Sequence, residues 1–128
     1  MSIALTWLGT NSFMVATPSK KLLVDPFVCL DNAENRNSID DFIGADAVLI
    51  THGHFDHLCS VPEILRLHPA LIIGTECSAA TLRRDIASLA RNSALSGMSE
   101  SEVEACCQYI VEVGPGSEFS LDDTHVRV

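Results

Sequence analysis

The first quarter of the chain alternates short apolar runs with turn residues, a pattern typical of consecutive strands. The three predicted strands cover 3–8, 12–17 and 22–24. Tight turns at Gly9-Thr10-Asn11 and after Pro18 favour an antiparallel meander. Asp25-Pro26 should end the third strand, because proline cannot donate a hydrogen bond within a central ladder.

The middle of the chain carries two continuous apolar runs that suit strands covered on both faces. These runs are 47–50 and 71–74. Between them, the S-x-x-E sequence from Ser60 to Glu63 predicts a capped helix that ends near Pro69. Because strand, helix and strand follow one another at this spacing, the two strands should run parallel in a βαβ unit.

The second half carries two helical patterns followed by three short strands. Apolar residues at helical spacing predict a helix over 78–90, and a second S-x-x-E sequence, Ser99 to Glu102, predicts another helix. The predicted closing strands cover 109–113, 118–121 and 124–128. The polar stretch 31–41 is interpreted as a solvated surface loop.

The densest group of potential metal ligands lies within six residues, directly after the apolar run 47–50. Its members are His52, His54, Asp56 and His57. Neutral imidazoles and a carboxylate suit zinc and similar divalent ions. His52 and His54 can converge on one ion, and Gly53 between them allows a backbone φ that a side chain would forbid. Asp56 and His57 could hold a second ion nearby. The alternative, a polar loop with merely exposed histidines, is weaker because all four side chains follow a buried strand.

Composition limits the class of protein. The 128 residues suffice for one domain with a core, and 47% of them are hydrophobic. No apolar run approaches the roughly 18–20 residues of a transmembrane helix, and the N-terminus lacks the basic residues of a signal peptide. Eight Lys and Arg against 17 Asp and Glu give a net charge of −9, which argues against a nucleic-acid partner. The five cysteines are odd in number and form no C-x-x-C pair, which favours buried thiols in a reducing cytoplasm.

The segment from His52 to His57, called the motif below, resembles the signature of the metallo-β-lactamase-fold hydrolases. That signature is a strand, then His-x-His-x-Asp-His, then a helix. Three further segments fit the resemblance: Trp7-Leu8-Gly9, the LLVDP sequence of 22–26 and the strand 46–51. Within that superfamily the chain is most similar to the ascorbate-6-phosphate lactonase-like proteins. The resemblance implies an α/β fold in which 1–128 form a single, incomplete domain. This domain would be the N-terminal half of an αββα sandwich, a mixed sheet with helices on one face.

The resemblance also implies roles for single residues. His52 and His54 would bind the first metal ion, and Asp56 and His57 the second. Asp56 would in addition act in catalysis by orienting the attacking water. Asp25 would be an outer carboxylate that holds the motif loop, although an aspartate before proline also suits an ordinary turn. The ions would be two zinc ions, with manganese or iron as alternatives.

Two departures from the family pattern bear on the site. Relatives often carry a histidine after the Trp-Leu-Gly sequence, where this chain has Thr10, so no pocket role passes to that position. The second half of the family's fold supplies further metal ligands, and His125 is the only late histidine here. We expect His125 to be a surface residue of the last strand and His68 to be a cation at a helix end.

The leading hypothesis is a cytoplasmic metal-dependent hydrolase of a small-molecule substrate. A metal-bound hydroxide would cleave an ester, lactone, amide or phosphodiester bond. The alternative is a non-catalytic metal-binding fragment or module that needs a second half or another subunit, joined through an unpaired sheet edge. A nuclease of the same fold shares the motif, but the net charge of −9 disfavours it. No nucleic-acid or membrane partner is expected.

Overall fold

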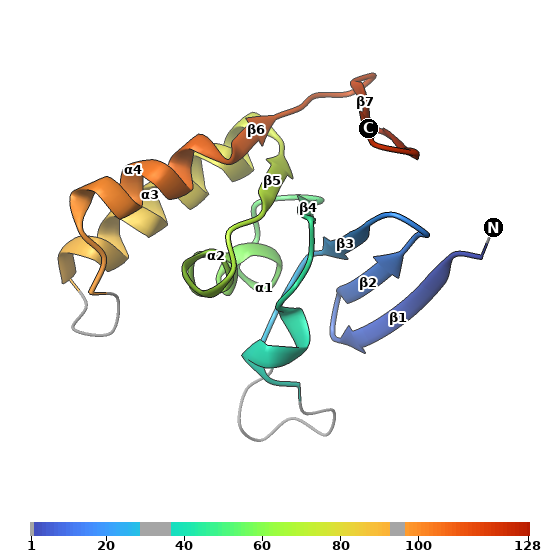
Figure 1. Cartoon of the computed structure of the whole chain (residues 1–128). Helices are drawn as coiled ribbons and strands as arrows, with labels where there is room; N and C mark the ends of the chain where they lie inside the picture. The colour runs from blue at the N-terminus through green and yellow to red at the C-terminus, as the bar shows by residue number, and fades with distance from the viewer. Residues whose placement is uncertain (1, 29–36, 93–96) are drawn as a thin grey trace.

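The computed structural model describes residues 2–28, 37–92 and 97–128. Six strands form one mixed sheet in the order β1-β2-β3-β4-β5-β6, and β7 and β8 form a separate two-stranded sheet (Figure 1). The strands of the large sheet are β1 (Ala4–Gly9), β2 (Ser12–Ala16), β3 (Lys21–Val24), β4 (Ala47–Ile50), β5 (Leu71–Gly74) and β6 (Ile110–Glu112). The two hairpin strands are β7 (Glu118–Leu121) and β8 (Thr124–Arg127).

The pairing of the strands confirms the predicted meander and βαβ unit. Strands β1, β2 and β3 pair antiparallel, whereas β3 with β4, β4 with β5 and β5 with β6 pair parallel.

The helices are η1 (Ile39–Phe42, a 3-10 helix), α1 (Phe55–Leu58), α2 (Val61–Leu67), α3 (Glu76–Asn92) and α4 (Glu100–Gln108). None of the helices in the described residues is long and apolar enough to cross a bilayer.

The helices cover one face of the sheet, as predicted for this α/β fold. Alternate residues of the inner strands, Leu23, Val48 and Ile72, point to this face and are at most 1% exposed. They meet apolar side chains of α2 and α3, such as Leu65 and Leu82. Figure 1 shows α3 and α4 side by side along this face. The parallel strands are therefore held from one side by a continuous apolar core.

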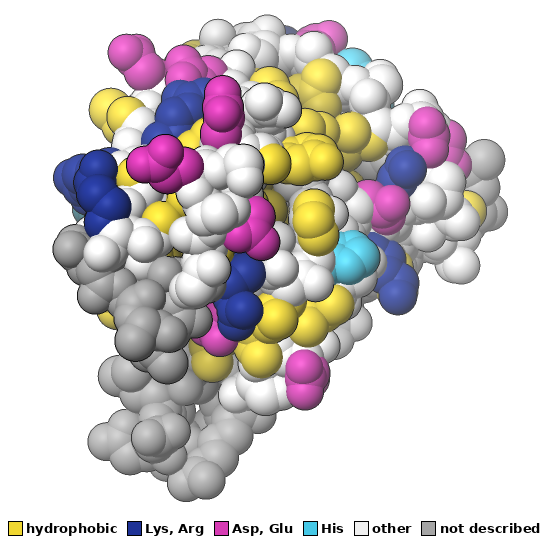
Figure 2. Space-filling view, turned by 60° about the vertical axis from the view of Figure 1, so that its left-hand side comes forward, with side chains coloured by type: hydrophobic (Ala, Val, Ile, Leu, Met, Phe, Trp, Pro, Cys, Tyr) yellow, Lys and Arg dark blue, Asp and Glu magenta, His cyan; other side chains and the backbone are white. Residues whose placement is uncertain are grey.

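The opposite face of the sheet is also apolar but is only partly covered. Its buried residues, Leu22, Ala47 and Ile73, pack against side chains of the β7–β8 hairpin. Toward the edge at β1, Leu5 and Trp7 remain 67% and 53% exposed. The hairpin thus covers the centre of this face and leaves its β1 edge open. Figure 2 turns the side of α3 and α4 forward, and there hydrophobic side chains gather in the middle with acidic and basic side chains around them.

Three local predictions can be compared with the structure. The capping box of Ser99 is confirmed, because Glu102 N–H donates to Ser99 Oγ and Ser99 N–H to Glu102 Oε2. The capping box of Ser60 is wrong: its backbone is already helical, with φ −85° and ψ −13°, because α1 ends just before it. Its hydroxyl instead accepts the Val28 N–H at 3.0 Å. Of the predicted solvated loop 31–41, residues 31–36 lie outside the described residues. Residues 39–41 belong to the 3-10 helix η1 instead.

The cysteines also differ in part from their prediction. The four cysteines within the described residues are free, and the fifth, Cys29, lies outside them. Three of the four, Cys59, Cys106 and Cys107, are partly buried, but Cys77 is exposed at the first turn of α3. The expectation of buried thiols is therefore wrong for Cys77.

Candidate metal centre

The motif occupies the junction between β4 and α1. The strand ends at Ile50, residues 51–54 follow without regular structure, and α1 begins at Phe55. The prediction that Gly53 takes a φ forbidden to side chains is wrong, because its φ is not positive. A Cβ at Gly53 would meet its nearest neighbour, Ser78 Oγ, at an ordinary 3.7 Å. The strand end and the helix start, not the glycine, therefore direct the ligands.

The first predicted ligand pair is brought together. His52 Nε2 and His54 Nδ1 lie 3.0 Å apart, and the two rings meet edge to face with centroids 4.5 Å apart. Two nitrogens bound to one tetrahedral zinc ion at about 2.0–2.1 Å would lie about 3.3 Å apart. The spacing of these two nitrogens therefore fits a shared divalent ion.

The second predicted pair also lies together, beside the first. Asp56 Oδ2 is 3.7 Å from His57 Nε2, and the ring of His57 lies 3.9 Å from that of His52, centroid to centroid. The side chain of His57 is largely buried and that of Asp56 is 43% exposed. All four predicted ligands thus occupy one small region at the carboxyl end of β4.

Asp25 connects this region to the sheet. It follows β3 directly, its side chain is 5% exposed, and its backbone φ of 46° lies in the left-handed region. Its carboxylate accepts the Thr51 N–H at 2.8 Å and the Thr51 hydroxyl at 2.6 Å. It also lies 2.9 Å from His57 Nδ1. Non-glycine residues that hydrogen bonds hold in the left-handed backbone conformation occur preferentially at functional sites.

These bonds determine which ring nitrogens can bind a metal. If His57 donates its Nδ1–H to Asp25, its Nε2 carries the lone pair. The Thr51 hydroxyl, which donates to Asp25, can accept Nδ1–H of His52 at 3.0 Å, and this leaves Nε2 of His52 as the acceptor. Metal-bound histidines are commonly oriented by a carboxylate or another acceptor in this way. The neighbours of Asp25 therefore favour the tautomers that metal binding needs.

Sequence reasoning missed Asn11, which was assigned only to a turn. Asn11 Nδ2 donates to Asp56 Oδ2 at 2.7 Å and lies 3.0 Å from His57 Nε2. The one sequence signal was its position after Trp7-Leu8-Gly9, where Thr10 drew attention as a departure from the family pattern. A contact across 45 residues of chain cannot be inferred from a single sequence.

The electrostatics favour an ionised carboxylate and disfavour a thiolate. Burial would raise the pKa of Asp56, but the hydrogen bond from Asn11 and the neighbouring imidazoles together hold this pKa below its usual value. Burial raises the pKa of the nearby Cys59 thiol, which opposes the thiolate form that a metal ligand needs. The carboxylate and the imidazoles are therefore the better ligands here.

The remaining histidines lie away from the motif. His68 follows the last residue of α2. His125 lies exposed on β8, 3.5 Å from Glu118 Oε2 through its Nε2. Within 2–28, 37–92 and 97–128, no three His, Cys, Asp or Glu side chains converge to hold one ion. The motif therefore supplies ligands in pairs.

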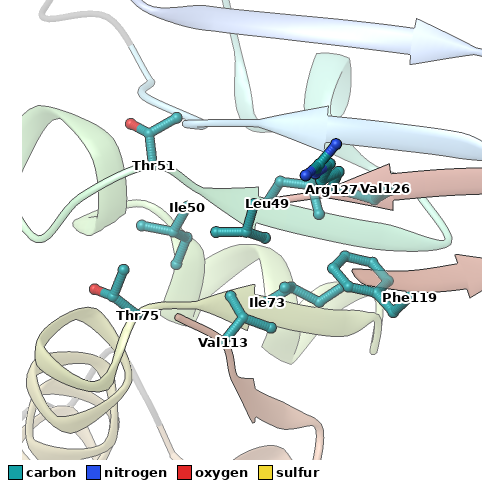
Figure 3. Close-up of a pocket in the computed structure, with 10 residues that line it drawn as sticks. Leu49, Ile50, Thr51, Ile73, Thr75, Val113, Phe119, Val126 and Arg127 are labelled. Carbon is teal, nitrogen blue, oxygen red and sulfur yellow. The ribbon is translucent and has the colours of Figure 1, made fainter. Parts of the chain in front are cut away.

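An apolar cavity of about 200 Å³ lies next to the motif, between β4, β5 and the hairpin (Figure 3). Its walls include Leu49, Ile73, Val113 and Phe119, and Thr51 lies at its edge. None of the four predicted metal ligands lines it. The cavity therefore belongs to the incompletely covered face of the sheet.

Comparisons with known proteins agree with this architecture. The family model of the metallo-beta-lactamase superfamily matches residues 5–104. A metal-dependent hydrolase of Roseiflexus castenholzii is 36% identical over 76 residues, covering 55% of this chain and 30% of that protein. Another, of Methanopyrus kandleri, is 39% identical over 70 residues, with the same two shares. The matched segments thus cover less than a third of these relatives.

A solved structure shows the same fold. The metallo hydrolase of the archaeon Ignicoccus hospitalis superimposes with a TM-score of 0.60 at 21% identity. The match covers 94% of this chain and 43% of that one. At this identity the likeness shows the fold alone.

The bonds of Asp25 predict the effect of one isosteric substitution. Thr51→Val removes the hydroxyl that donates to the buried carboxylate. We expect the free energy of unfolding to fall by about 1–3 kcal/mol, because a buried acceptor loses a partner. Thr6→Val, at an exposed position of β1, should change it by no more than about 0.5 kcal/mol. Urea denaturation of both variants measures the difference, and equal effects would contradict the assigned role of Thr51.

Proposed function

The chain belongs to the metallo-beta-lactamase superfamily, and we propose that it carries the metal motif of a metal-dependent hydrolase. The carrying observation is the 3.0 Å approach of His52 Nε2 to His54 Nδ1 at the carboxyl end of β4. Its relatives from Roseiflexus castenholzii and Methanopyrus kandleri are named metal-dependent hydrolases, which supports the same activity here. Their matched segments include less than a third of each protein, so the activity of the whole remains a proposal.

We propose a separate role in metal binding for each pair of motif residues and for Asp25. His52 and His54 would hold one divalent ion, and Asp56 and His57 a second. We propose zinc for both, with manganese or iron as alternatives, because imidazole and carboxylate suit all three. Such ions polarise a carbonyl or phosphoryl oxygen and lower the pKa of water. Asp25 would keep Nε2 of His57 available by accepting its Nδ1–H.

The proposed substrates are small molecules with an ester, lactone, amide or phosphodiester bond. Asp56 would orient the attacking water by accepting a hydrogen bond, which its lowered pKa favours by keeping it ionised. The net charge of −9 makes nucleic acid a poor substrate, because phosphate backbones require cationic surfaces. Free cysteines in the described residues suit a reducing compartment, so we propose the cytoplasm as its location.

Metal analysis tests this function. After zinc, manganese or iron reconstitution and dialysis, we expect elemental analysis to find bound metal in the wild-type chain. His54→Ala should reduce it far more than His68→Ala, because His68 lies at the end of α2, away from the motif. A panel of ester, lactone, amide and phosphodiester substrates, with His52→Ala as the inactive control, then measures activity. A chain that retains no metal, or equal effects of the two substitutions, would contradict the proposal.

A second candidate is a metal-binding module that another polypeptide completes. Two observations favour it: ligands come in pairs among the described residues, and Leu5 and Trp7 expose apolar side chains on the edge strand β1. Exposed patches of this kind commonly mark protein interfaces. We propose that a second copy, or a separately encoded second half, covers this face.

Self-association can be tested on one strand. We expect sedimentation equilibrium to show concentration-dependent dimers, because burying apolar surface favours association. Leu5→Lys should weaken the dimer by about tenfold or more, the equivalent of 1.4 kcal/mol. Thr6→Lys is the matched control, because side chains alternate along a strand and Thr6 points to the other face. A wild-type chain that stays monomeric would rule out the second copy as the covering partner.

A further inference from the structure

We infer that Asn11 is a third protein ligand of the ion held by Asp56 and His57. The inference rests on the proposed metal site, and it concerns an element that the motif does not include. Asn11 lies in the turn between β1 and β2, more than 40 residues before the motif in sequence. Catalytic zinc sites commonly have three protein ligands. Asn11 would complete such a set where the motif provides two.

The position of the Asn11 amide carries the inference. Its Nδ2 lies 2.7 Å from Asp56 Oδ2 and 3.0 Å from His57 Nε2, atoms of the two side chains proposed to hold one ion. Each of these contacts uses a lone pair of the other atom. When His57 donates its Nδ1–H to Asp25, its Nε2 carries the single lone pair with which it can accept from Asn11 or bind a metal ion. The Asn11 amide therefore faces the place where a cation would engage both atoms.

The chemistry of a carboxamide fits both states of such a site. Its NH₂ group can donate to Asp56 and His57 when no cation lies between them. A half-turn of the amide exchanges the nitrogen with the carbonyl oxygen, which accepts. Asparagine oxygens bind divalent ions such as calcium, and carbonyl oxygens also suit manganese. The Asn11 side chain can therefore hydrogen-bond to Asp56 and His57 in the absence of metal and bind the same ion as they do in its presence.

Contacts on both sides of Asn11 fix the conformation of the turn that carries it. Thr10 has a φ of 47°, a rare value for a β-branched residue, and its carbonyl accepts the Trp7 indole N–H at 3.1 Å. On the other side of Asn11, the buried Ser12 hydroxyl donates to the Asp25 carbonyl at 2.9 Å. The turn is thus fixed to the residue that orients His57. Backbone strain held by surrounding bonds is typical of functional positions.

Two substitutions distinguish a ligand from a residue that only fills the turn. Asn11→Leu keeps the approximate size and removes both polar atoms, whereas Asn11→Asp keeps an oxygen ligand and adds charge. The probe is Co²⁺ alone, added to the full 128-residue chain. Calorimetric titration gives the number of ions and their affinities, and visible absorption reports the coordination of each ion. Circular dichroism checks folding, and Asn11→Ala replaces the leucine variant if that one does not fold.

If Asn11 is a ligand, Asn11→Leu should lower the affinity for one of two bound ions by about tenfold or more. Mutating residues that only hydrogen-bond to metal ligands already lowers metal affinity by about 10–100-fold. Asn11→Asp should retain or tighten that ion, and the other ion should be unchanged in both variants. Equal affinities in Asn11→Leu and wild type, equal weakening of both ions, loss of the ion in Asn11→Asp, or a wild-type chain with one ion would overturn the inference. A wild-type chain without any bound Co²⁺ would overturn the proposed function itself.

Discussion

The buried carboxylate of Asp25 is the constraint on which the arrangement of the motif depends. Asp25 directly follows β3, beside the end of the parallel strand β4, and its carboxylate accepts both the backbone N–H and the hydroxyl of Thr51. Burying a carboxylate is costly unless it is hydrogen-bonded, and these contacts, with Nδ1 of His57, provide that compensation. A single side chain therefore joins the sheet to the first residue of the motif loop and to a predicted ligand.

The two faces of the sheet have different consequences for function. The helix-covered face gives the parallel strands a complete apolar core, so that β4 presents the motif from a fixed base. On the other face, the described residues Leu22, Ala47 and Ile73 are buried where the β7–β8 hairpin packs, and Leu5 and Trp7 are exposed. The motif lies at the strand ends between these two faces. Its surroundings therefore depend on what covers the open face, as well as on the residues of the motif.

Much of the fold was predictable from local pattern, because alternation, apolar runs and helical spacing reflect burial within each element. The strands, the βαβ unit and the Ser99 cap follow from such signals. The predictions for Ser60 and Gly53 failed, because α1 already makes the backbone at Ser60 helical and the loop at Gly53 needs no unusual φ. The four motif residues could be selected from their spacing alone. Asn11 could not, because its contact with Asp56 depends on the β1–β2 turn packing against a distant loop.

Asp25 and Thr51 place the four motif side chains at the end of β4 as two pairs, His52 with His54 and Asp56 with His57. Anomalous diffraction at the zinc edge, from crystals of the zinc-loaded chain, measures whether each pair binds an ion. We predict two peaks, one bound by His52 and His54 and the other by Asp56 and His57, with Asp25 still contacting Thr51 and His57. Zinc bound elsewhere, for example at His125, with these four side chains unliganded, would show that the two pairs do not form the metal site.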